Sequence, residues 1–165
     1  MRESKQITRG YFSIGVENIS KPMNLGNLIR SAHAFGANSV FTINPHKRVT
    51  ENKDKISKSD TSKSTYHLPY YEWDTIEDIT LPKGCKIIGI EITEDAESLP
   101  NFVHPMQAMY ILGPEKGSLS GKTLSMADHV IKIPTSFSLN VAIAGAIVMY
   151  DRCLLYTSPS PRDRG

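Results

Sequence analysis

Short runs of apolar residues, separated by polar connections, dominate the pattern of this chain. Residues 11–17, 39–43, 86–92, 108–113 and 128–133 each have the length and the β-branched or aromatic character of a strand. The last three runs are almost continuously apolar, which is typical of strands that are covered on both faces. The pattern therefore predicts a buried sheet.

Two other segments have the character of helices. Apolar residues recur at helical spacing from Leu25 to Phe35, and Gly36 follows where a left-handed C-terminal cap is common. This predicts a helix of about ten residues after an Asn-Leu-Gly turn. Residues 138–152 are apolar nearly all round and contain Ala and Gly for close packing, so they predict a buried helix.

The alternation of strands and helices predicts an α/β fold, with a mainly parallel sheet flanked by helices. Ligands of such folds bind at the carboxyl ends of the strands. The loops after residues 16, 92, 113 and 133 are therefore the expected site. The sequence has no internal repeat, and we expect a single domain over residues 1–153.

The polar segment 45–65 contains almost no apolar residue and is expected to form a long loop or a loose helix. Between residues 47 and 63 it carries six basic and three acidic residues. This is as compatible with a solvated loop as with a loop that faces phosphate groups. On the second interpretation, the candidate phosphate-binding residues are Lys47, Arg48, Lys53 and Lys55.

The composition is that of a globular protein, with 39% hydrophobic and 22% charged residues, and the net charge of +2 does not by itself indicate a nucleic-acid binder. No apolar run approaches the length of a membrane span, and the first residues lack the apolar centre of a signal peptide, so we expect a cytoplasmic protein. Cys85 and Cys153 lie far apart and predict neither a disulfide framework nor a metal site. Residues 154–165 resemble translated adaptor sequence, and we expect them to be a non-native tail.

Three polar, partly glycine-containing stretches fall in the expected site loops: "NLGNLIR" (24–30), "ILGPEKGSLS" (111–120) and "IPTSFSLNV" (133–141). In the second, Gly113 and Gly117 flank Glu115, so backbone groups could grip a nucleoside closely. Taken alone, such a turn is more often only a turn. It matches neither the dinucleotide nor the P-loop fingerprint.

Single residues in the other two stretches are ambiguous. Ser138 is as suitable for a helix N-cap as for a catalytic role. Asn140, expected one turn into an apolar helix, needs a hydrogen-bond partner from a neighbouring loop or a ligand. Arg30 lies at or near the polar edge of its predicted helix, where a solvated arginine is common.

Together, in this order, the three motifs resemble the SpoU/TrmH family of SPOUT methyltransferases over residues 11–152. The first motif is Asn24-Leu25-Gly26 followed by Arg30 and "AHAFGA", the second is "ILGPEKGSLS", and the third is "IPTSFSLNVAIAGAIVMYD". The resemblance implies a C-terminal trefoil knot, a homodimer, S-adenosylmethionine (AdoMet) as cofactor, and methylation of a ribose 2′-hydroxyl of RNA. The favoured substrate is tRNA, with rRNA as the alternative.

The resemblance also implies roles for individual residues. The catalytic set is Asn24, Arg30, Glu115, Ser138 and Asn140. The cofactor-contact positions are Ile92, Gly113, Ile133 and Leu139. RNA is then expected to lie on the dimer surface, with the 46–63 segment as a further contact. The chain departs from the family pattern where only Thr135, Ser136 and Phe137 separate "IP" from "SLN", since many members have a longer, glycine-containing loop there.

Two other functions remain open on the sequence: a non-catalytic RNA-binding relative, and a base-directed tRNA methyltransferase. The role of Arg30 is also open, because a free arginine has a pKa above about 12 and is a poor base. It either accepts the ribose proton after its pKa is lowered, or it stays charged, binds an RNA phosphate and stabilises the developing alkoxide.

Overall fold

A computed structural model describes residues 10–59 and 67–157 of the chain. Within them, seven parallel strands form one sheet in the order β3-β2-β1-β6-β4-β7-β5. The strands are β1 (Tyr11–Glu17), β2 (Ser39–Ile43), β3 (Tyr70–Trp73), β4 (Lys86–Ile90), β5 (Glu97–Ser98), β6 (Gln107–Leu112) and β7 (His129–Lys132). The five predicted strands are confirmed, with ends that move by at most two residues.

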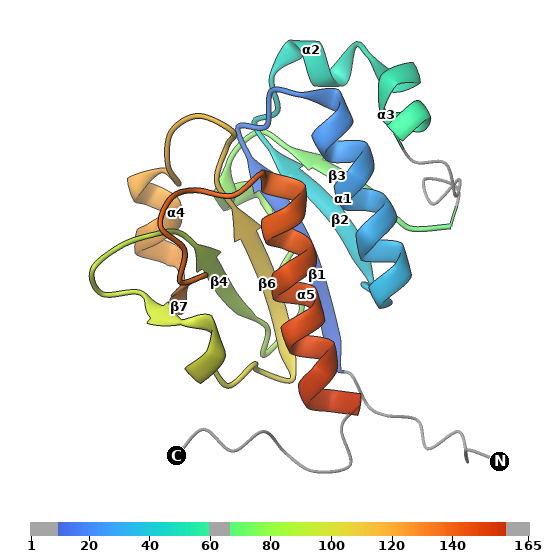
Figure 1. Cartoon of the computed structure of the whole chain (residues 1–165). Coiled ribbons are helices and arrows are strands. Elements are labelled where there is room, and N and C mark those ends of the chain that lie inside the picture. The colour runs from blue at the N-terminus through green and yellow to red at the C-terminus, as the bar shows by residue number, and fades with distance from the viewer. Residues whose placement is uncertain (1–9, 60–66, 158–165) are drawn as a thin grey trace, which may run out of the picture.

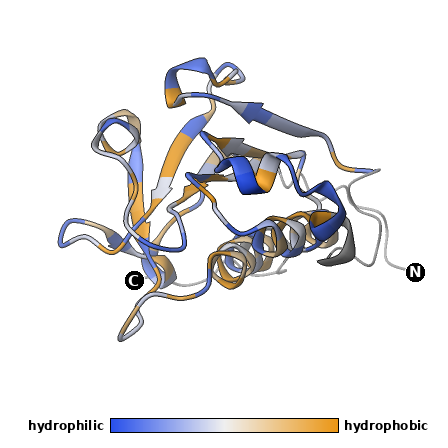
Figure 2. Ribbon diagram, turned by 90° about the horizontal axis from the view of Figure 1, so that it is seen from above, coloured by the Kyte–Doolittle hydropathy of each residue, from blue (hydrophilic) through white to orange (hydrophobic). Residues whose placement is uncertain are grey.

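The helices lie mainly against one face of the sheet. They are α1 (Pro22–Phe35), α2 (Lys47–Thr50), α3 (Lys53–Ser59), α4 (Gly121–Met126) and α5 (Val141–Thr157), with 3₁₀ turns at Ile76–Asp78 and Leu99–Asn101. In Figure 1, α1 and α5 run side by side across the front of the sheet, and both begin at its upper edge, where the strands end. Figure 2 shows the two helices nearly end-on along one side of the sheet.

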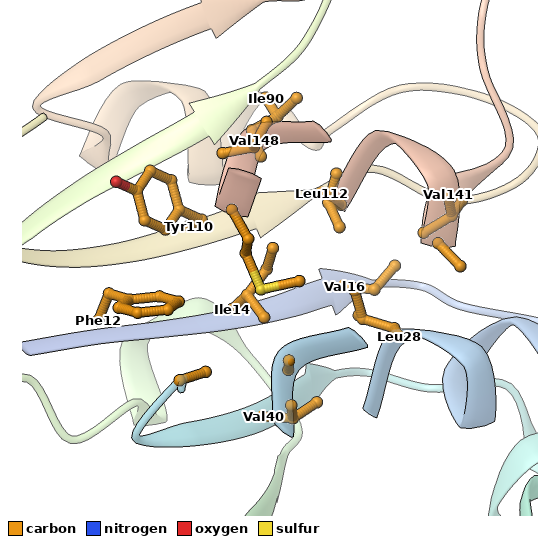
Figure 3. Close-up of a cluster of buried hydrophobic side chains, with 14 of the residues drawn as sticks. Phe12, Ile14, Val16, Leu28, Val40, Ile90, Tyr110, Leu112, Val141 and Val148 are labelled. Atoms are coloured by element: carbon orange, nitrogen blue, oxygen red, sulfur yellow. The ribbon is translucent and has the colours of Figure 1, made fainter. Parts of the chain in front are cut away.

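Both faces of the sheet are covered, as the apolar runs predict. On one face, Ile14 of β1 packs between Leu28 of α1 and Val148 of α5 (Figure 3). On the other face, Phe41 and Ile111 belong to a second apolar cluster, with Leu119 and partly buried side chains of α4. The sheet is therefore the centre of the core. Because both faces are covered, a ligand site is expected at the edge where the strands end.

Close packing of α1 on α5 depends on Gly145. A Cβ atom at this position would lie 2.6 Å from Cδ1 of Leu28, which is closer than carbon atoms can approach. The C-terminal cap of α1 is Gly36, with φ of 79° in the left-handed region, as expected from the sequence.

The helix boundaries differ from the sequence expectation. Helix α1 begins at Pro22, a residue well suited to the first helical position, so Asn24 and Gly26 are helical and do not form a turn. Helix α5 runs to Thr157, which is past residue 152 and into the segment expected to be a tail; residues 158–165 lie outside the described residues. The segment 45–65 folds in part into α2 and α3, and residues 60–66 are likewise not described.

One face of α5 is not buried, contrary to the expectation for an apolar helix. Ile143 and Tyr150 are more than half exposed, and Leu154 is also exposed on the same side of the helix. Among the described residues, no helix is long and apolar enough to cross a membrane. The same part of the chain contains no cluster of three or more His, Cys, Asp or Glu side chains that could hold a metal ion.

Candidate active site

Three of the predicted catalytic side chains are joined by hydrogen bonds at the carboxyl edge of the sheet. Asn24 Nδ2 donates to Glu115 Oε2 across 3.0 Å, and Asn140 Nδ2 donates to Asn24 Oδ1 across 3.1 Å. These residues come from the first turn of α1, the loop after β6 and the residue before α5. The fold thus brings the three sequence motifs to one place.

Glu115 is the most heavily bonded residue of this cluster. Its carboxylate also accepts hydrogen bonds from the backbone N–H groups of Ser20 and Lys21, each at 2.9 Å, and from the hydroxyl of Ser20 at 3.0 Å. Burial would raise the pKa of Glu115, but the hydrogen bonds from Asn24, Ser20 and Lys21 outweigh it and lower the pKa below its ordinary value. Glu115 is therefore an ionised acceptor that fixes the start of α1.

Asn140 caps helix α5, which corrects its expected position one turn inside that helix. Its Oδ1 accepts from the backbone N–H groups of Ala142 at 2.9 Å and Ile143 at 3.2 Å. The N-cap is therefore Asn140 and not Ser138. With Oδ1 used by the helix, the amide nitrogen of Asn140 is the atom that meets Asn24.

This arrangement fixes the orientation of the Asn24 amide. Its nitrogen faces a carboxylate, which can only accept, and its oxygen faces the nitrogen of Asn140. A flip of the amide would lose both bonds. Asn24 is itself buried, so the loss of either bond would leave a polar atom without a partner.

Arg30 lies in α1, six residues after Asn24, and is exposed. At the rise of an α-helix it is about 9 Å further along the axis. It shares the exposed side of α1 with Met23 and Asn27. The structure thus places Arg30 on the outer face of the helix that carries Asn24, and its chemical role stays a prediction.

All four predicted cofactor-contact residues line a cavity beside the cluster. Ile92 follows β4, Gly113 follows β6, and Ile133 and Leu139 belong to the segment between β7 and α5. Leu112, Val141 and Ala144 add apolar surface, and the loop residues Pro114 and Gly117 form part of the rim. Such a cavity suits a flat, apolar ring with polar edges.

Gly113 keeps this cavity open. A Cβ atom there would lie 3.3 Å from the backbone nitrogen of Leu119 and 3.4 Å from Oε2 of Glu91. A side chain at residue 113 would therefore press against the loop that follows. The expectation that a ligand approaches the backbone closely here stays a prediction.

Ser138 lines the cavity and is not part of the Asn24–Glu115–Asn140 chain of hydrogen bonds. The short connection before it is held by the Thr135 hydroxyl, which donates to the carbonyl of Phe137 across 2.7 Å. Thr135 also lines the cavity, whereas Phe137 is exposed. The three-residue connection therefore forms a tight turn at the mouth of the cavity.

Two carboxylates that the sequence analysis did not select hold the 113–120 loop. Glu91, which lines the cavity, accepts from the Leu119 N–H at 2.7 Å. Glu17, buried at the end of β1, accepts from the Ser120 N–H at 2.7 Å and from the hydroxyl of Thr123. Both are acids at the carboxyl ends of apolar strands, and that position is the signal by which they could have been found.

The four basic candidates lie on two short helices next to α1. Lys47 and Arg48 belong to α2, and Lys53 and Lys55 belong to α3, and all four are exposed. His46 caps α2, because its Nδ1 accepts from the Arg48 N–H at 3.0 Å. Only Arg48 of the four lines a hollow beside the cluster, together with Glu115.

The chain is similar in sequence to proteins named as RNA methyltransferases. The chain is 26% identical over 139 residues to the tRNA (guanosine(18)-2′-O)-methyltransferase of Thermus thermophilus, covering 82% of this chain and 71% of that protein. It is 26% identical over 145 residues to the enzyme of the same name from Escherichia coli, covering 84% of this chain and 61% of that protein. The chain thus spans about two thirds of the length of these relatives.

Solved structures show the same fold. The SpoU methyltransferase AviRb from Streptomyces viridochromogenes superposes with a TM-score of 0.76 at 20% identity, covering 88% of this chain and 60% of that one. A further structure of AviRb holds AdoMet, with a TM-score of 0.74 at 20% identity, covering 87% and 59%. A sequence model of the SpoU rRNA Methylase family matches residues 11–150. The chain belongs to the SpoU rRNA Methylase family.

Proposed function

We propose that the protein is an RNA methyltransferase that uses AdoMet to methylate a ribose 2′-hydroxyl. The observation that carries this proposal is the hydrogen-bonded cluster of Asn24, Glu115 and Asn140, which adjoins the cavity through the loop from Gly113 to Gly117. Family membership and the 2′-O-methyltransferase names of the relatives support it.

The cavity residues fit AdoMet as cofactor. Ile133 and Leu139 offer apolar contact for the adenine ring, and the backbone of Gly113 offers polar groups for its edges. The carboxylate of Glu91 suits ribose hydroxyls or an ammonium group, since its hydrogen bonds from the Ile92 and Leu119 N–H groups leave further acceptor capacity. When bound, AdoMet supplies a methyl group on a positively charged sulfur.

The protein's own task is to activate and orient the ribose hydroxyl, which is a weak nucleophile. We assign the activating role to Arg30, which is exposed to an incoming RNA strand. A charged guanidinium there binds a phosphate through two parallel hydrogen bonds and stabilises the developing alkoxide as the hydroxyl proton passes to solvent water. We favour this role over proton acceptance, because Arg30 is exposed to solvent and a solvated guanidinium is a hydrogen-bond donor with no acceptor.

Asn24, Asn140 and Glu115 then act as the framework that places the nucleophile. Glu115 fixes the first turn of α1, and Asn140 ties that turn to α5. Holding reactants in line contributes strongly to rate, because it removes the entropic cost of their encounter. Ser138 lies at the cavity wall, and we assign it a contact with the reacting ribose or the cofactor.

A homodimer is part of this proposal. Ile143 and Tyr150 form an exposed apolar stripe along α5, and Met23 is exposed at the start of the adjoining α1. Contiguous apolar surface of this kind usually marks an interface. A second copy of the chain is the partner that we propose for it, with RNA held on the dimer surface and by Lys47, Arg48, Lys53 and Lys55.

The substrate RNA, the knot, the domain bounds and the cellular compartment are proposed from the resemblance to the family. We propose tRNA as the preferred substrate, with rRNA as the alternative, because the relatives are named as tRNA and rRNA methyltransferases. We further propose that the segment after β7 forms the trefoil knot, that residues 1–153 are the catalytic domain with a non-native tail at 154–165, and that the enzyme works in the cytoplasm.

Mapping of 2′-O-methyl sites in cellular RNA tests the function. RNA from cells with the gene, without it, and with the Arg30→Gln variant would be compared by a method that reports protection of the neighbouring phosphodiester. One site or a few sites should be methylated only with the wild-type gene. Identical maps from all three strains would contradict the proposal.

A further inference from the structure

A second hollow adjoins the catalytic cluster and shares Pro114 and Gly117 with the cofactor cavity. Three cationic residues line it, and they come from separate segments: Lys21 precedes α1, Arg48 lies in α2, and Lys116 follows Glu115 in the loop after β6. Segments far apart in the sequence thus deliver positive charge to one place.

The charge of this hollow is not neutralised within the described chain. Its one carboxylate, Glu115, already accepts from Ser20, Lys21 N–H and Asn24. Among residues 10–59 and 67–157, the ion pairs join other groups and involve none of the three cations. The hollow therefore carries three positive charges against one negative charge and favours an anionic ligand.

The wall of the hollow has an unusual backbone. Asn18, which lines it, has a φ of 60°, and its neighbour Asn44 has a φ of 47°, both in the left-handed region that few residues other than glycine adopt. Asn44 Nδ2 donates to Asn18 Oδ1 across 2.8 Å, and the Asn18 N–H donates to the carbonyl of Ile43 across 2.8 Å. Such conformations cost energy and cluster at functional sites.

We propose that this hollow, lined by Lys21, Arg48 and Lys116, binds a phosphodiester group of the substrate RNA beside the target ribose. The inference rests on the proposed function. Every internal ribose of an RNA strand carries a phosphate on each side, so a strand that presents its 2′-hydroxyl to the cofactor cavity must place phosphates next to it. The shared residues Pro114 and Gly117 put the cationic hollow within that short span.

The three cations serve this ligand in different ways. Arg48 presents a planar fork that can donate two parallel hydrogen bonds to phosphate oxygens, whereas Lys21 and Lys116 act as mobile point charges. Phosphate contacts position a strand without reading its bases. The hollow therefore sets the register of the RNA on the enzyme and leaves the choice of nucleotide to other contacts.

Salt-dependent RNA binding tests this site directly. Bulk tRNA would be titrated at several salt concentrations, without AdoMet, against wild type and the Lys21→Gln, Arg48→Gln, Lys116→Gln and triple variants. Each single change should weaken binding about 5-fold for all RNAs and reduce the slope of log K against log salt concentration by about 1. Lys86→Gln, at the amino end of β4 and so at the opposite edge of the sheet, is the matched control and should change neither quantity.

AdoMet affinity, measured by calorimetry, should be the same in the triple variant as in wild type, which shows that the cavity has kept its structure. A triple variant with the wild-type RNA affinity and salt slope would overturn the assignment. Inorganic phosphate that binds the wild type as tightly as tRNA does would also overturn it, in favour of a small-anion site. If RNA binding follows the expected pattern but wild type transfers no methyl group, the proposed function fails and the RNA site stands.

Discussion

The side chain of Asn140 donates from Nδ2 to Oδ1 of Asn24 across 3.1 Å, and so joins the N-cap of α5 to the first turn of α1. The two residues are 116 positions apart. Because Asn24 in turn donates to Glu115, one chain of hydrogen bonds connects all three family motifs. The geometry of the reaction is expected to depend on this chain.

Two substitutions of Asn140 separate its two roles. Asn140→Asp keeps an acceptor for the α5 N-terminus but cannot donate to Asn24, whereas Asn140→Ala loses both functions. The alanine variant should lose about 1 kcal/mol of unfolding free energy, and the aspartate variant should lose little. Both should lower kcat for methyl transfer about 100-fold, because the nucleophile is no longer well placed.

Urea denaturation and single-turnover methyl transfer would measure these effects. Full activity in a stably folded Asn140→Asp variant would refute the positioning role of the Asn24 bond. If Asn140→Asp lost stability and Asn140→Ala did not, the role of Asn140 as the N-cap of α5 would be refuted.

The free energy of unfolding at acidic pH should reveal the titration of Glu115. Its folded pKa is lowered by the hydrogen bonds from Asn24, Ser20 and Lys21, so the stabilisation is present above the pKa of an unfolded glutamate and is lost as the pH falls through the lower, folded pKa. Glu115→Gln removes this titration. The wild type should therefore lose its advantage over the variant on the acid side of the ordinary glutamate range and keep it at neutral pH. Unfolding curves with the same difference at every pH would contradict this.

Gly113→Ala should impair cofactor binding without unfolding the protein. The added methyl group would lie 3.3 Å from the Leu119 nitrogen and 3.4 Å from Oε2 of Glu91, and would disturb the hydrogen bond between them that holds the loop beside the cavity. We expect AdoMet affinity to fall about tenfold, measured by calorimetry. Gly121→Ala is the control, because a Cβ there meets no atom within 4 Å. Equal AdoMet affinity in both variants would argue against the assigned cofactor cavity.

Much of the fold could be predicted from the sequence, because strands buried on both faces leave continuous apolar runs. β3 was not predicted, since its side chains are mostly exposed at the sheet edge, and β5 is only two residues long. The start of α1 was placed too late because glycine at residue 26 suggested a turn, while Pro22 already begins the helix. Packing against the sheet and α5 overrides the weak helix propensity of that glycine.

The sequence predicts the local structure around the site residues less accurately than it predicts the strands. Ser138 and Asn140 are both good N-cap residues, and local sequence does not decide between them. The choice is made by a tertiary contact with Asn24, which no local pattern encodes. Glu17 and Glu91 are marked by their position at the carboxyl ends of apolar strands, but their hydrogen-bond partners lie in the 119–123 segment, far along the chain, and no local pattern identifies those partners.

The apolar stripe on α5 predicts a dimer, and a charged substitution within the stripe should disrupt it. Ile143→Glu places a carboxylate in the middle of that surface and should convert a dimer into a monomer, as measured by analytical ultracentrifugation. Val103→Glu changes a residue that is 73% exposed outside α5 and should leave the dimer intact. A wild type that sediments as a monomer would contradict the assignment of this surface.

Methyl transfer should require both the charge and the planar guanidinium of Arg30. Arg30→Lys keeps a charge but loses the planar fork, and Arg30→Gln loses the charge. Both should lower methyl transfer about 100- to 1,000-fold while AdoMet affinity is unchanged. If Arg30 acts as a charge, the residual rate of Arg30→Lys should have the same pH dependence as that of wild type; a shift of the pH–rate profile towards the pKa of lysine would instead identify a proton acceptor.

The most direct test of the central claim is transfer of a labelled methyl group from AdoMet to RNA, followed by digestion to nucleosides. The account predicts label in a 2′-O-methylated nucleoside, with tRNA a better substrate than rRNA, and transfer by Arg30→Gln about 100- to 1,000-fold slower than by wild type. Label on a base, or no AdoMet-dependent transfer to either RNA by the wild-type protein, would contradict it.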